Sequence, residues 1–386
     1  MTRPPGRWET LPAEVTVLIV VHTVASLMRV LDYVELVEDD PRIRLEWTVA
    51  PDRFNVGVTA TLAHLGIEVL PWDEATERPY DLALATSLHR VEEITAKHRF
   101  AAPHGCGYGK KYPGWAWPAD QEPPVYGLDR ESLLDRYGRL VFSKIVVPHD
   151  KDLDTLNRQC PEAGHTGVVA GDLTFDRLLA GKAFRERYRL DLGVRRQQTL
   201  VAVGSTWGGE SLLRHFPELP LRLLKELPAD HRVVMTMHPA VWFEHGPRHV
   251  RAWLRDATEA GLDLIDPGAD WRPLLAAADF FVGDHTSLTP YAAAAGLPVL
   301  LSHFTRDEIA PSSTVAELAG VSPMLTDEPL PTLLAKAAVA QPDQQRIALG
   351  RISSQLGRSA LVVRETLYAL IGLPEPAAPP RIEPTH

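Results

Sequence analysis

Short apolar runs alternate with amphipathic stretches along most of the chain. Residues Val15–Val21 form a continuous apolar run, VTVLIVV, that is typical of a central strand in a parallel sheet. Apolar residues at helical spacing follow at 26–37, and another apolar run follows at 45–49. A strand, a helix and a strand in this order, joined by this length of chain, predict a crossover between parallel strands.

The same alternation continues through both halves of the chain. Further strands are predicted at 67–71, 81–86, 143–147, 168–169, 199–203, 232–237, 262–265, 280–282 and 298–302. Helices are predicted at 59–65, 132–138, 152–157, 175–180, 210–215, 219–226, 250–260, 288–295, 314–318, 330–340 and 346–371. The fold class that follows is α/β, with two Rossmann-like, doubly wound parallel sheets.

Length sets the expected number of domains. A chain of 386 residues exceeds what one hydrophobic core usually fills, so two domains are expected. The polar, arginine-rich segment 185–198 has no apolar period and predicts a linker, which gives domains at 1–190 and 191–373. The helical stretch 346–371 is a candidate to cross back to the first domain, and the proline-rich tail 374–386 is expected to be disordered.

Composition narrows the class of protein. Hydrophobic residues make up 45% and charged residues 23% of the chain, as in an ordinary soluble enzyme. A net charge of −10 argues against a nucleic-acid surface and leaves a local basic cleft open. The two cysteines, Cys106 and Cys160, form no CxxC pair, so neither a disulfide framework nor a zinc ribbon is predicted. No apolar stretch has the length of a signal peptide or a spanning helix, and a cytoplasmic location is expected.

Polar residues with candidate chemistry lie between the strand at 280–282 and the helix at 288–295. These residues are Asp284, His285, Thr286 and Ser287. Hydroxyls and unpaired N–H groups at the start of a helix bind anions well, so a phosphate is the expected guest. The plain alternative is that Ser287 only caps its helix.

Two other strand ends in the second half carry similar residues. Ser205 and Thr206 follow the strand at 199–203, and His238 follows the strand at 232–237. The carboxyl ends of parallel strands share one edge of a sheet, so these groups are expected to converge with the 284–287 turn. Convergence of this kind favours a phosphate-binding site over separate capping residues.

A glycine-rich loop, PHGCGYGKK, occupies residues 103–111 in the first half. Its backbone amides and the ammonium groups of Lys110 and Lys111 can approach an anion closely, and His104 is a candidate base for a group transfer. The alternative is a flexible surface turn with solvated lysines. Trp115 and Trp117, just beyond it, either line an acceptor pocket or pack the loop onto its own domain.

Several common motifs are absent from the sequence. Neither GxGxxG, nor a P-loop, nor HExxH occurs, which removes the usual support for nicotinamide chemistry, Walker-type ATP hydrolysis and zinc proteolysis. No acidic triplet suggests a metal-dependent sugar-nucleotide site either. The sequence therefore favours a metal-free transfer, with no cofactor and no metal ligands.

Five segments together resemble the CDP-glycerol glycerophosphotransferase family, the teichoic-acid polymerases and primases. They are PHGCGYGKK (103–111), GDLTFDRLL (171–179), STW (205–207), MHP (237–239) and LLAAADFFVGDHTS (274–287). The resemblance implies the GT-B architecture, in which two Rossmann-like domains face a cleft. It also implies an N-terminal acceptor domain and a C-terminal nucleotide-donor domain.

The resemblance departs from the family pattern at several positions. Cys106 replaces a threonine, Gly208 stands where an arginine is expected, and His285 replaces a tyrosine. Thr286 and Ser287 stand in place of paired serines. Loss of the arginine removes a bidentate phosphate contact, which a lysine replaces only as a point charge.

The resemblance also implies roles for individual residues. Thr286 and Ser287 would hold the donor's phosphates, His238 would bind the transferred phosphoryl group or its leaving group, and His104 would take the acceptor's proton. The remaining candidates would complete the donor side; they are Lys110, Lys111, Ser205, Thr206, Asp284 and His285. Positioned cations and amides supply most of the catalysis in phosphoryl transfer, so a metal is dispensable in this scheme.

The expected function is transfer of glycerol phosphate, or a related polyol phosphate, from a CDP-activated donor to a hydroxyl acceptor. Two alternatives stay open: a GT-B glycosyltransferase or epimerase that uses a UDP-, GDP- or dTDP-sugar, and a non-catalytic relative that binds nucleotide. The expected partners are a nucleotide-activated small molecule and a hydroxyl acceptor, not a nucleic acid. Membrane association is left open, because the acidic chain shows no plain basic surface or amphipathic helix for it.

Overall fold

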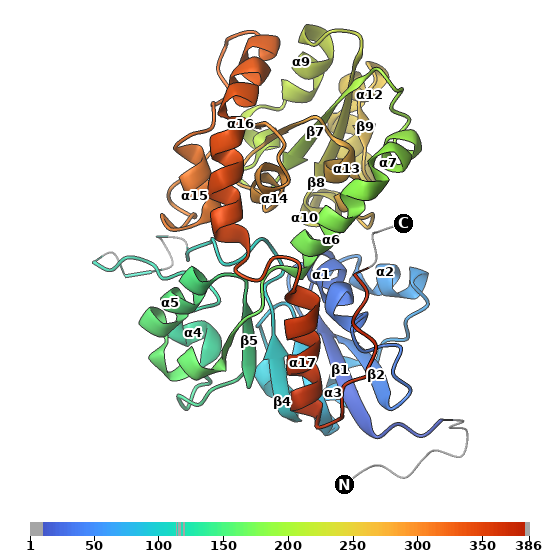
Figure 1. Ribbon diagram of the computed structural model, residues 1–386, viewed down its shortest axis with the longest axis vertical. Coiled ribbons are helices and arrows are strands. Elements are labelled where there is room, and N and C mark those ends of the chain that lie inside the picture. Colours follow the sequence, from blue (N-terminus) through green and yellow to red (C-terminus); the bar gives the residue numbers. More distant parts are fainter. Residues whose placement is uncertain (1–10, 113, 115–116, 119, 383–386) are drawn as a thin grey trace. The chain divides into compact units, whose positions relative to one another are not determined.

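The computed structural model describes residues 11–112, 114, 117–118 and 120–382, and these divide into two compact units (Figure 1). Unit 1 contains the chain up to Tyr108, Pro124–Thr174 and Ser353–Ile382. Unit 2 contains Gly109–Pro123 and Phe175–Ile352. The chain therefore passes between the units more than once, and each unit is described by itself below.

Unit 1 is built on a six-stranded parallel sheet of order β2-β1-β3-β4-β5-β6. Its strands are β1 Val15–Val21, β2 Ile43–Val49, β3 Tyr80–Ala85, β4 Ala96–Ala101, β5 Lys144–Val147 and β6 Gly167–Val169. Its helices are α1 Val24–Val34, α2 Val58–His64, α3 Trp72–Glu77, α4 Arg130–Leu133, α5 Asp150–Gln159 and α17 Ser359–Ile371. α17 packs on β3 and β4, so the predicted return of the C-terminal helical stretch to the first half is confirmed.

Unit 2 is built on a five-stranded parallel sheet of order β11-β10-β7-β8-β9. Its strands are β7 Thr199–Ser205, β8 His231–Met237, β9 Asp263–Leu264, β10 Phe280–Gly283 and β11 Val299–Leu301. Its helices are α7 Arg185–Asp191, α8 Leu212–His215, α9 Leu219–Glu226, α10 Pro239–His245, α11 Pro247–Trp253, α12 Arg255–Glu259, α13 Arg272–Ala277, α14 Leu288–Ala294, α15 Thr314–Ala319 and α16 Leu330–Ile352. Helix α6, Leu173–Gly181, spans the boundary between the two units. The predicted α/β class with two parallel sheets is confirmed.

The first crossover shows how the sequence specifies a strand-to-helix turn. β1 is almost wholly buried, and Thr23 directly after it caps α1. The Thr23 hydroxyl accepts from Ser26 N at 3.0 Å, and the Ser26 hydroxyl accepts from Thr23 N at 2.9 Å. This reciprocal capping box satisfies backbone N–H groups that a helix start otherwise leaves unpaired. It fixes the point at which the chain leaves the sheet.

Several predicted elements are wrong in part, and turn chemistry explains three of them. The strand at 67–71 reduces to Leu70, which bridges Thr48, after the positive φ of Gly66. The helix at 132–138 ends at Leu133, because Asp135 Oδ1 accepts from Tyr137 N and Arg139 N and closes a turn. The stretch 346–371 is broken between α16 and α17, where Gly357 adopts a φ of 71°.

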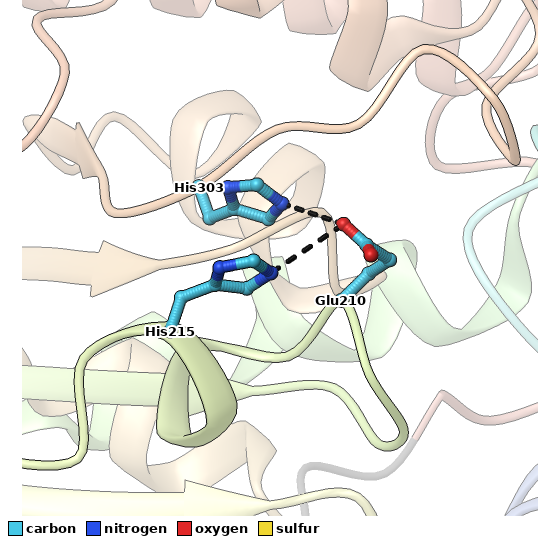
Figure 2. A group of neighbouring side chains, drawn as sticks. All are labelled: Glu210, His215 and His303. Carbon is cyan, nitrogen blue, oxygen red and sulfur yellow. Dashed lines mark hydrogen bonds and ion pairs between the residues drawn. The ribbon is translucent and has the colours of Figure 1, made fainter.

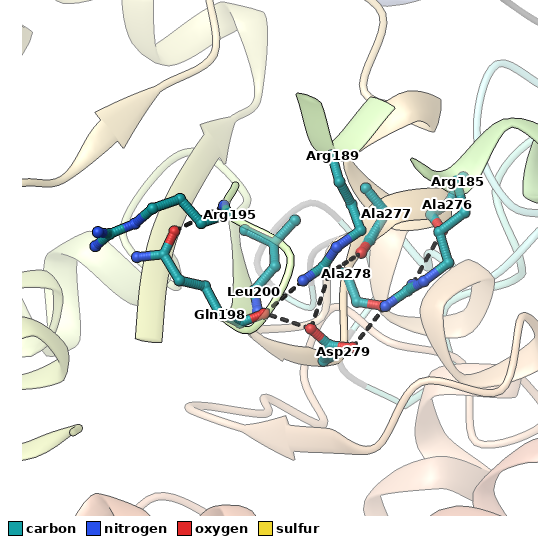
Figure 3. A network of polar contacts seen from close by, with 9 residues as sticks. All are labelled: Arg185, Arg189, Arg195, Gln198, Leu200, Ala276, Ala277, Ala278 and Asp279. Atoms are coloured by element: carbon teal, nitrogen blue, oxygen red, sulfur yellow. Dashed lines mark hydrogen bonds and ion pairs between the residues drawn. The ribbon is translucent and has the colours of Figure 1, made fainter. Parts of the chain in front are cut away.

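The predicted linker at 185–198 is also wrong in part, because α7 lies within it and is held to the start of β10 (Figure 3). Arg185 Nη2 and Arg189 Nη1 lie 2.6 and 3.0 Å from the two oxygens of Asp279. Asp279 also accepts from Leu200 N at 2.8 Å. Arg185 and Arg189 further donate to backbone carbonyls of the segment that ends α13. Arg185 and Arg189 thus clamp α7 to the start of β10, so this part of the segment is not a flexible connection.

We expect Asp279→Ala to lower the free energy of unfolding of unit 2 by about 2 kcal/mol, because two guanidinium groups and one backbone N–H lose a shared acceptor. Urea unfolding followed by circular dichroism measures the change. Asp266→Ala is the control, since Asp266 is exposed and forms a single ion pair with Arg251. Equal unfolding midpoints for the two variants would contradict the clamp.

Candidate functional site

The carboxyl ends of three neighbouring strands of unit 2 carry the predicted polar residues. β7 lies between β10 and β8, with Gly204 opposite Gly283 on one side and Ser205 opposite Met237 on the other. Ser205 and Thr206, His238, and the 284–287 turn therefore leave the same sheet edge from adjacent strands. The predicted convergence of these strand ends is confirmed.

Two glycines allow the ends of β7 and β10 to close over one aromatic ring. A Cβ atom on Gly204 would lie 2.6 Å from Phe281 Cζ, and one on Gly283 would lie 2.6 Å from Phe281 Cε1. Such separations are far below van der Waals contact, so any larger residue would displace the ring or the backbone. Glycine at both positions therefore lets the two turns lie close together.

Asp284 joins these turns through its carboxylate. The side chain is fully buried and accepts from Thr206 N at 2.9 Å, Leu212 N at 2.7 Å and Thr286 N at 2.9 Å. Burial raises the pKa of Asp284 to about 6, and the three backbone donors oppose that rise. Both carboxylate oxygens are thus engaged within the protein. Asp284 therefore fixes the backbone of the turns after β7 and β10, and a ligand at this edge would be bound by other side chains.

The hydroxyl groups at the carboxyl edge of the unit 2 sheet differ in their exposure to solvent. Ser205 is buried and donates from Oγ to the carbonyl of Thr206 at 3.0 Å. Thr206 and Thr286 are buried as well. Ser287 is exposed, and its side chain makes no capping hydrogen bond to α14, so the plain capping interpretation does not describe it. Ser287 is the hydroxyl of this turn that solvent reaches.

His238 and Trp207 flank the exit from β7. His238 N donates to Ser205 O at 2.9 Å, and His238 Nδ1 accepts from Ala240 N at 3.2 Å. Because Nδ1 accepts, the neutral ring carries its proton on Nε2, which makes Nε2 a hydrogen-bond donor. The ring centroids of Trp207 and His238 lie 6.3 Å apart. A donor and an indole face therefore stand side by side at this edge.

The lysine pair of the glycine-rich loop belongs to unit 2. Gly109 O accepts from Ala310 N at 2.9 Å, Lys111 N donates to Glu308 O at 2.9 Å, and Lys110 bridges Ile309 in antiparallel fashion. This short ladder places Lys110 Nζ 5.6 Å from the centre of the Trp207 ring. Lys111 Nζ instead lies 4.0 Å from Glu122 Oε1. Lys110 is thus the cation that stands next to Trp207.

His285 is a buried, neutral imidazole next to this group. It is 5% exposed, and its Nδ1 has no hydrogen-bond partner among the described residues. Burial lowers the pKa of His285 to about 4, and the nearby positive charge of Lys110 lowers it further. His285 therefore carries no charge at neutral pH and supplies no cation to bind a phosphate.

His104 lies in unit 1, in the turn that follows β4. Its exposed ring places Nδ1 3.0 Å from Thr86 O. A carbonyl can only accept, so Nδ1 carries the proton and Nε2 carries the lone pair of the neutral ring. This tautomer has the form that a general base requires. The remaining candidates all lie in unit 2.

A buried ion pair that the sequence did not indicate supports the turn after His104. Arg29 Nη1 lies 3.1 Å from Asp172 Oδ1, and Arg29 Nη2 donates to Gly105 O. Both side chains are almost fully buried. Asp172 falls inside the segment GDLTFDRLL that carried the family resemblance, which was the one available signal for it. The pair holds the backbone of the glycine-rich turn.

The aromatic loop is described only in part. Tyr112 and Trp117 stack with ring centroids 5.2 Å apart, a packing contact within the loop. Trp115 lies outside the described residues. Among the described helices, none is both long and apolar enough to cross a membrane.

The fold of this chain is similar to that of several solved structures. No family model and no curated protein matches the sequence. Among solved structures, the wall teichoic acid polymerase TagF soaked with CDPG superposes with a TM-score of 0.62 at 11% identity, over 93% of this chain and 89% of that one. S. aureus MnaA with UDP gives a TM-score of 0.55 at 12% identity, over 94% and 99%. Anabaena HepE with UDP-glucose gives 0.51 at 15% identity, over 92% and 100%. With its two parallel sheets, the chain has the GT-B fold.

Proposed function

We propose that the protein transfers glycerol phosphate, or a related polyol phosphate, from a CDP-activated donor to a hydroxyl acceptor. One arrangement carries the proposal: Lys110, Trp207 and His238 gather beside turns that Asp284 fastens, at the carboxyl edge of the unit 2 sheet. A cation, an aromatic face and an imidazole donor suit a nucleotide with its phosphates. The fold of TagF, whose structure was soaked with CDPG, supports the choice of donor.

The proposed reaction uses groups of the chain itself. Nε2 of His104 takes the proton from the acceptor hydroxyl, whose oxygen forms a bond to the phosphorus that bears glycerol. The bond between this phosphorus and the bridging oxygen breaks, and CMP leaves. The Nε2–H of His238 donates to a phosphate oxygen, and Lys110 offsets the negative charge. Fixed donors and cations lower the barrier of phosphoryl transfer by stabilising charge on the equatorial oxygens.

A second candidate is a glycosyltransferase or epimerase that uses a nucleotide sugar. It is favoured by the fold shared with MnaA, solved with UDP, and HepE, solved with UDP-glucose. The products distinguish the two candidates. Glycerol phosphate transfer releases CMP, whereas glycosyl transfer releases a nucleoside diphosphate.

Nucleotide binding tests the proposal directly. We expect CDP-glycerol and CDP to raise the melting temperature more than UDP, GDP or dTDP at equal concentration, because the ligand with the lower Kd stabilises the folded chain more. A ligand at 100 times its Kd adds about 2.7 kcal/mol to stability. Calorimetry with the best ligand then gives the affinity, and chromatography identifies the nucleotide released with an acceptor. A larger shift with UDP-glucose than with CDP-glycerol would favour the second candidate instead.

Lys110→Met is expected to weaken CDP binding by about 10-fold, or about 1.4 kcal/mol, because it removes the cation beside Trp207. Calorimetry of the folded variant measures the change. Lys225→Met on α9 is the matched control, since it removes a lysine outside the predicted site. An unchanged affinity in Lys110→Met would exclude Lys110 from the donor site.

A further inference from the structure

Glu210, His215 and His303 form a second polar cluster in unit 2 (Figure 2). Glu210 lies in the turn between β7 and α8, His215 ends α8, and His303 follows the end of β11. One ligand-type atom of each residue lies within 4.8 Å of those of the other two. These residues converge although His303 is 93 positions from Glu210.

The two imidazoles point the same ring atom at one carboxylate oxygen, as Figure 2 shows. His303 Nε2 lies 2.8 Å and His215 Nε2 3.5 Å from Glu210 Oε2. The rings are stacked, with centroids 3.8 Å apart and planes inclined by 24°. Two ligand atoms of one tetrahedral zinc ion lie about 3.3 Å apart, since each is about 2.0–2.1 Å from the metal. The two measured separations lie on either side of that value.

The donor set and its exposure also suit a metal ion. Two neutral imidazoles and one carboxylate form a common ligand set for Zn²⁺ and related divalent transition metals. The side chains of Glu210, His215 and His303 are 38%, 36% and 24% exposed. An ion can therefore enter from solvent, and a fourth position is left for water or another oxygen ligand.

We propose that Glu210, His215 and His303 bind one divalent transition-metal ion of the Zn²⁺ class through Glu210 Oε2 and the two Nε2 atoms. The ion joins the turn after β7 to the segment after β11. The latter segment continues to Glu308 and Ala310, which pair with the loop that carries Lys110. The sequence predicted no metal site. Because no step of the proposed transfer uses this ion, the inference stands apart from the proposed function.

Metal binding by the full chain, freed of any affinity tag and stripped with a chelator, tests the inference. We expect Zn²⁺, titrated against a chromophoric chelator, to bind at one ion per chain. Glu210→Gln, His215→Ala and His303→Ala are each expected to weaken binding by about 10-fold or more, since even second-shell changes cost about that much. His245→Ala is the matched control: it also removes a histidine of unit 2, one whose ring meets that of Trp253 edge-on, outside the cluster.

A second measurement covers the case in which a variant folds poorly. Co²⁺ added to the stripped wild-type chain is expected to show the intense visible bands of a four- or five-coordinate ion with imidazole ligands. The inference is overturned if wild-type chain binds no stoichiometric Zn²⁺, or if folded His303→Ala binds it as tightly as His245→Ala. It is also overturned if Co²⁺ gives only the weak bands of the hydrated ion.

Discussion

Asp284→Ala is expected to cost about 3 kcal/mol of the free energy of unfolding, the largest stability effect of any substitution in the predicted site. The carboxylate accepts from the backbone N–H groups of Thr206, Leu212 and Thr286, and all three would be left buried without an acceptor. Urea unfolding monitored by circular dichroism measures the loss. Nucleotide affinity is expected to fall with it, because both turns lose their common anchor.

Two further variants show whether the effect comes from these hydrogen bonds. Asp284→Asn keeps one acceptor oxygen and is expected to retain part of the lost stability. Asp230→Ala removes an exposed carboxylate that pairs with the neighbouring His231, and is expected to change stability by less than about 0.5 kcal/mol. A stability of Asp284→Ala within that same small range would contradict the anchoring role.

His104→Ala is expected to reduce transfer by about 10²- to 10⁴-fold, the contribution typical of a positioned general base. Its affinity for CDP is expected to stay within about twofold of wild type, because the proposed role of His104 is to take the proton of the acceptor and not to hold the donor. Release of CMP in the presence of acceptor gives the rate, and calorimetry gives the affinity.

The matched control is His98→Ala, which removes another histidine of unit 1 from within β4. It is expected to transfer at the wild-type rate. If His104→Ala and His98→Ala transfer equally fast on an identified donor and acceptor, His104 is not the base. A loss of CDP binding in His104→Ala would instead place that residue on the donor side.

The fold was predictable because its signals are local. Val15–Val21, Leu219–Glu226 and most other elements are specified by apolar period and by the turn residues beside them. Adjacent parallel strands then place Ser205, His238 and Asp284 at one edge without further information. The strand ends and the polar residues on them could therefore be predicted from the sequence.

Contacts between distant residues were not predictable in the same way. The segment 185–198 was predicted to be a linker, because Asp279, the partner of Arg185 and Arg189, lies 94 and 90 residues away from them in the chain. Arg185 and Arg189 are four positions apart and so share a face of α7, which was the overlooked signal. The carboxylate of Asp284 was expected at a ligand, but it is buried and accepts from three backbone N–H groups.

The same limit applies to the cluster of Glu210, His215 and His303. Glu210 lies in the turn after β7 and His215, five residues later, ends α8, so their spacing alone did not indicate a shared site. His303 comes from a different strand end. Only the order of strands in the sheet brings β11 and β7 to either side of β10 and so gathers the three side chains.

The pairing of Gly109–Lys111 with residues 308–310 bears on how the polypeptide can be divided. These residues precede β5 in the chain, yet they complete a ladder whose other side is nearly 200 positions later. A fragment of residues 1–190 would lack α17, which packs on the sheet of unit 1. The complementary fragment, from residue 191 onward, would lack the Lys110 segment that pairs with residues 308–310 of unit 2. We therefore expect neither half to be obtained in native form when expressed alone, and co-expression of the two to restore both.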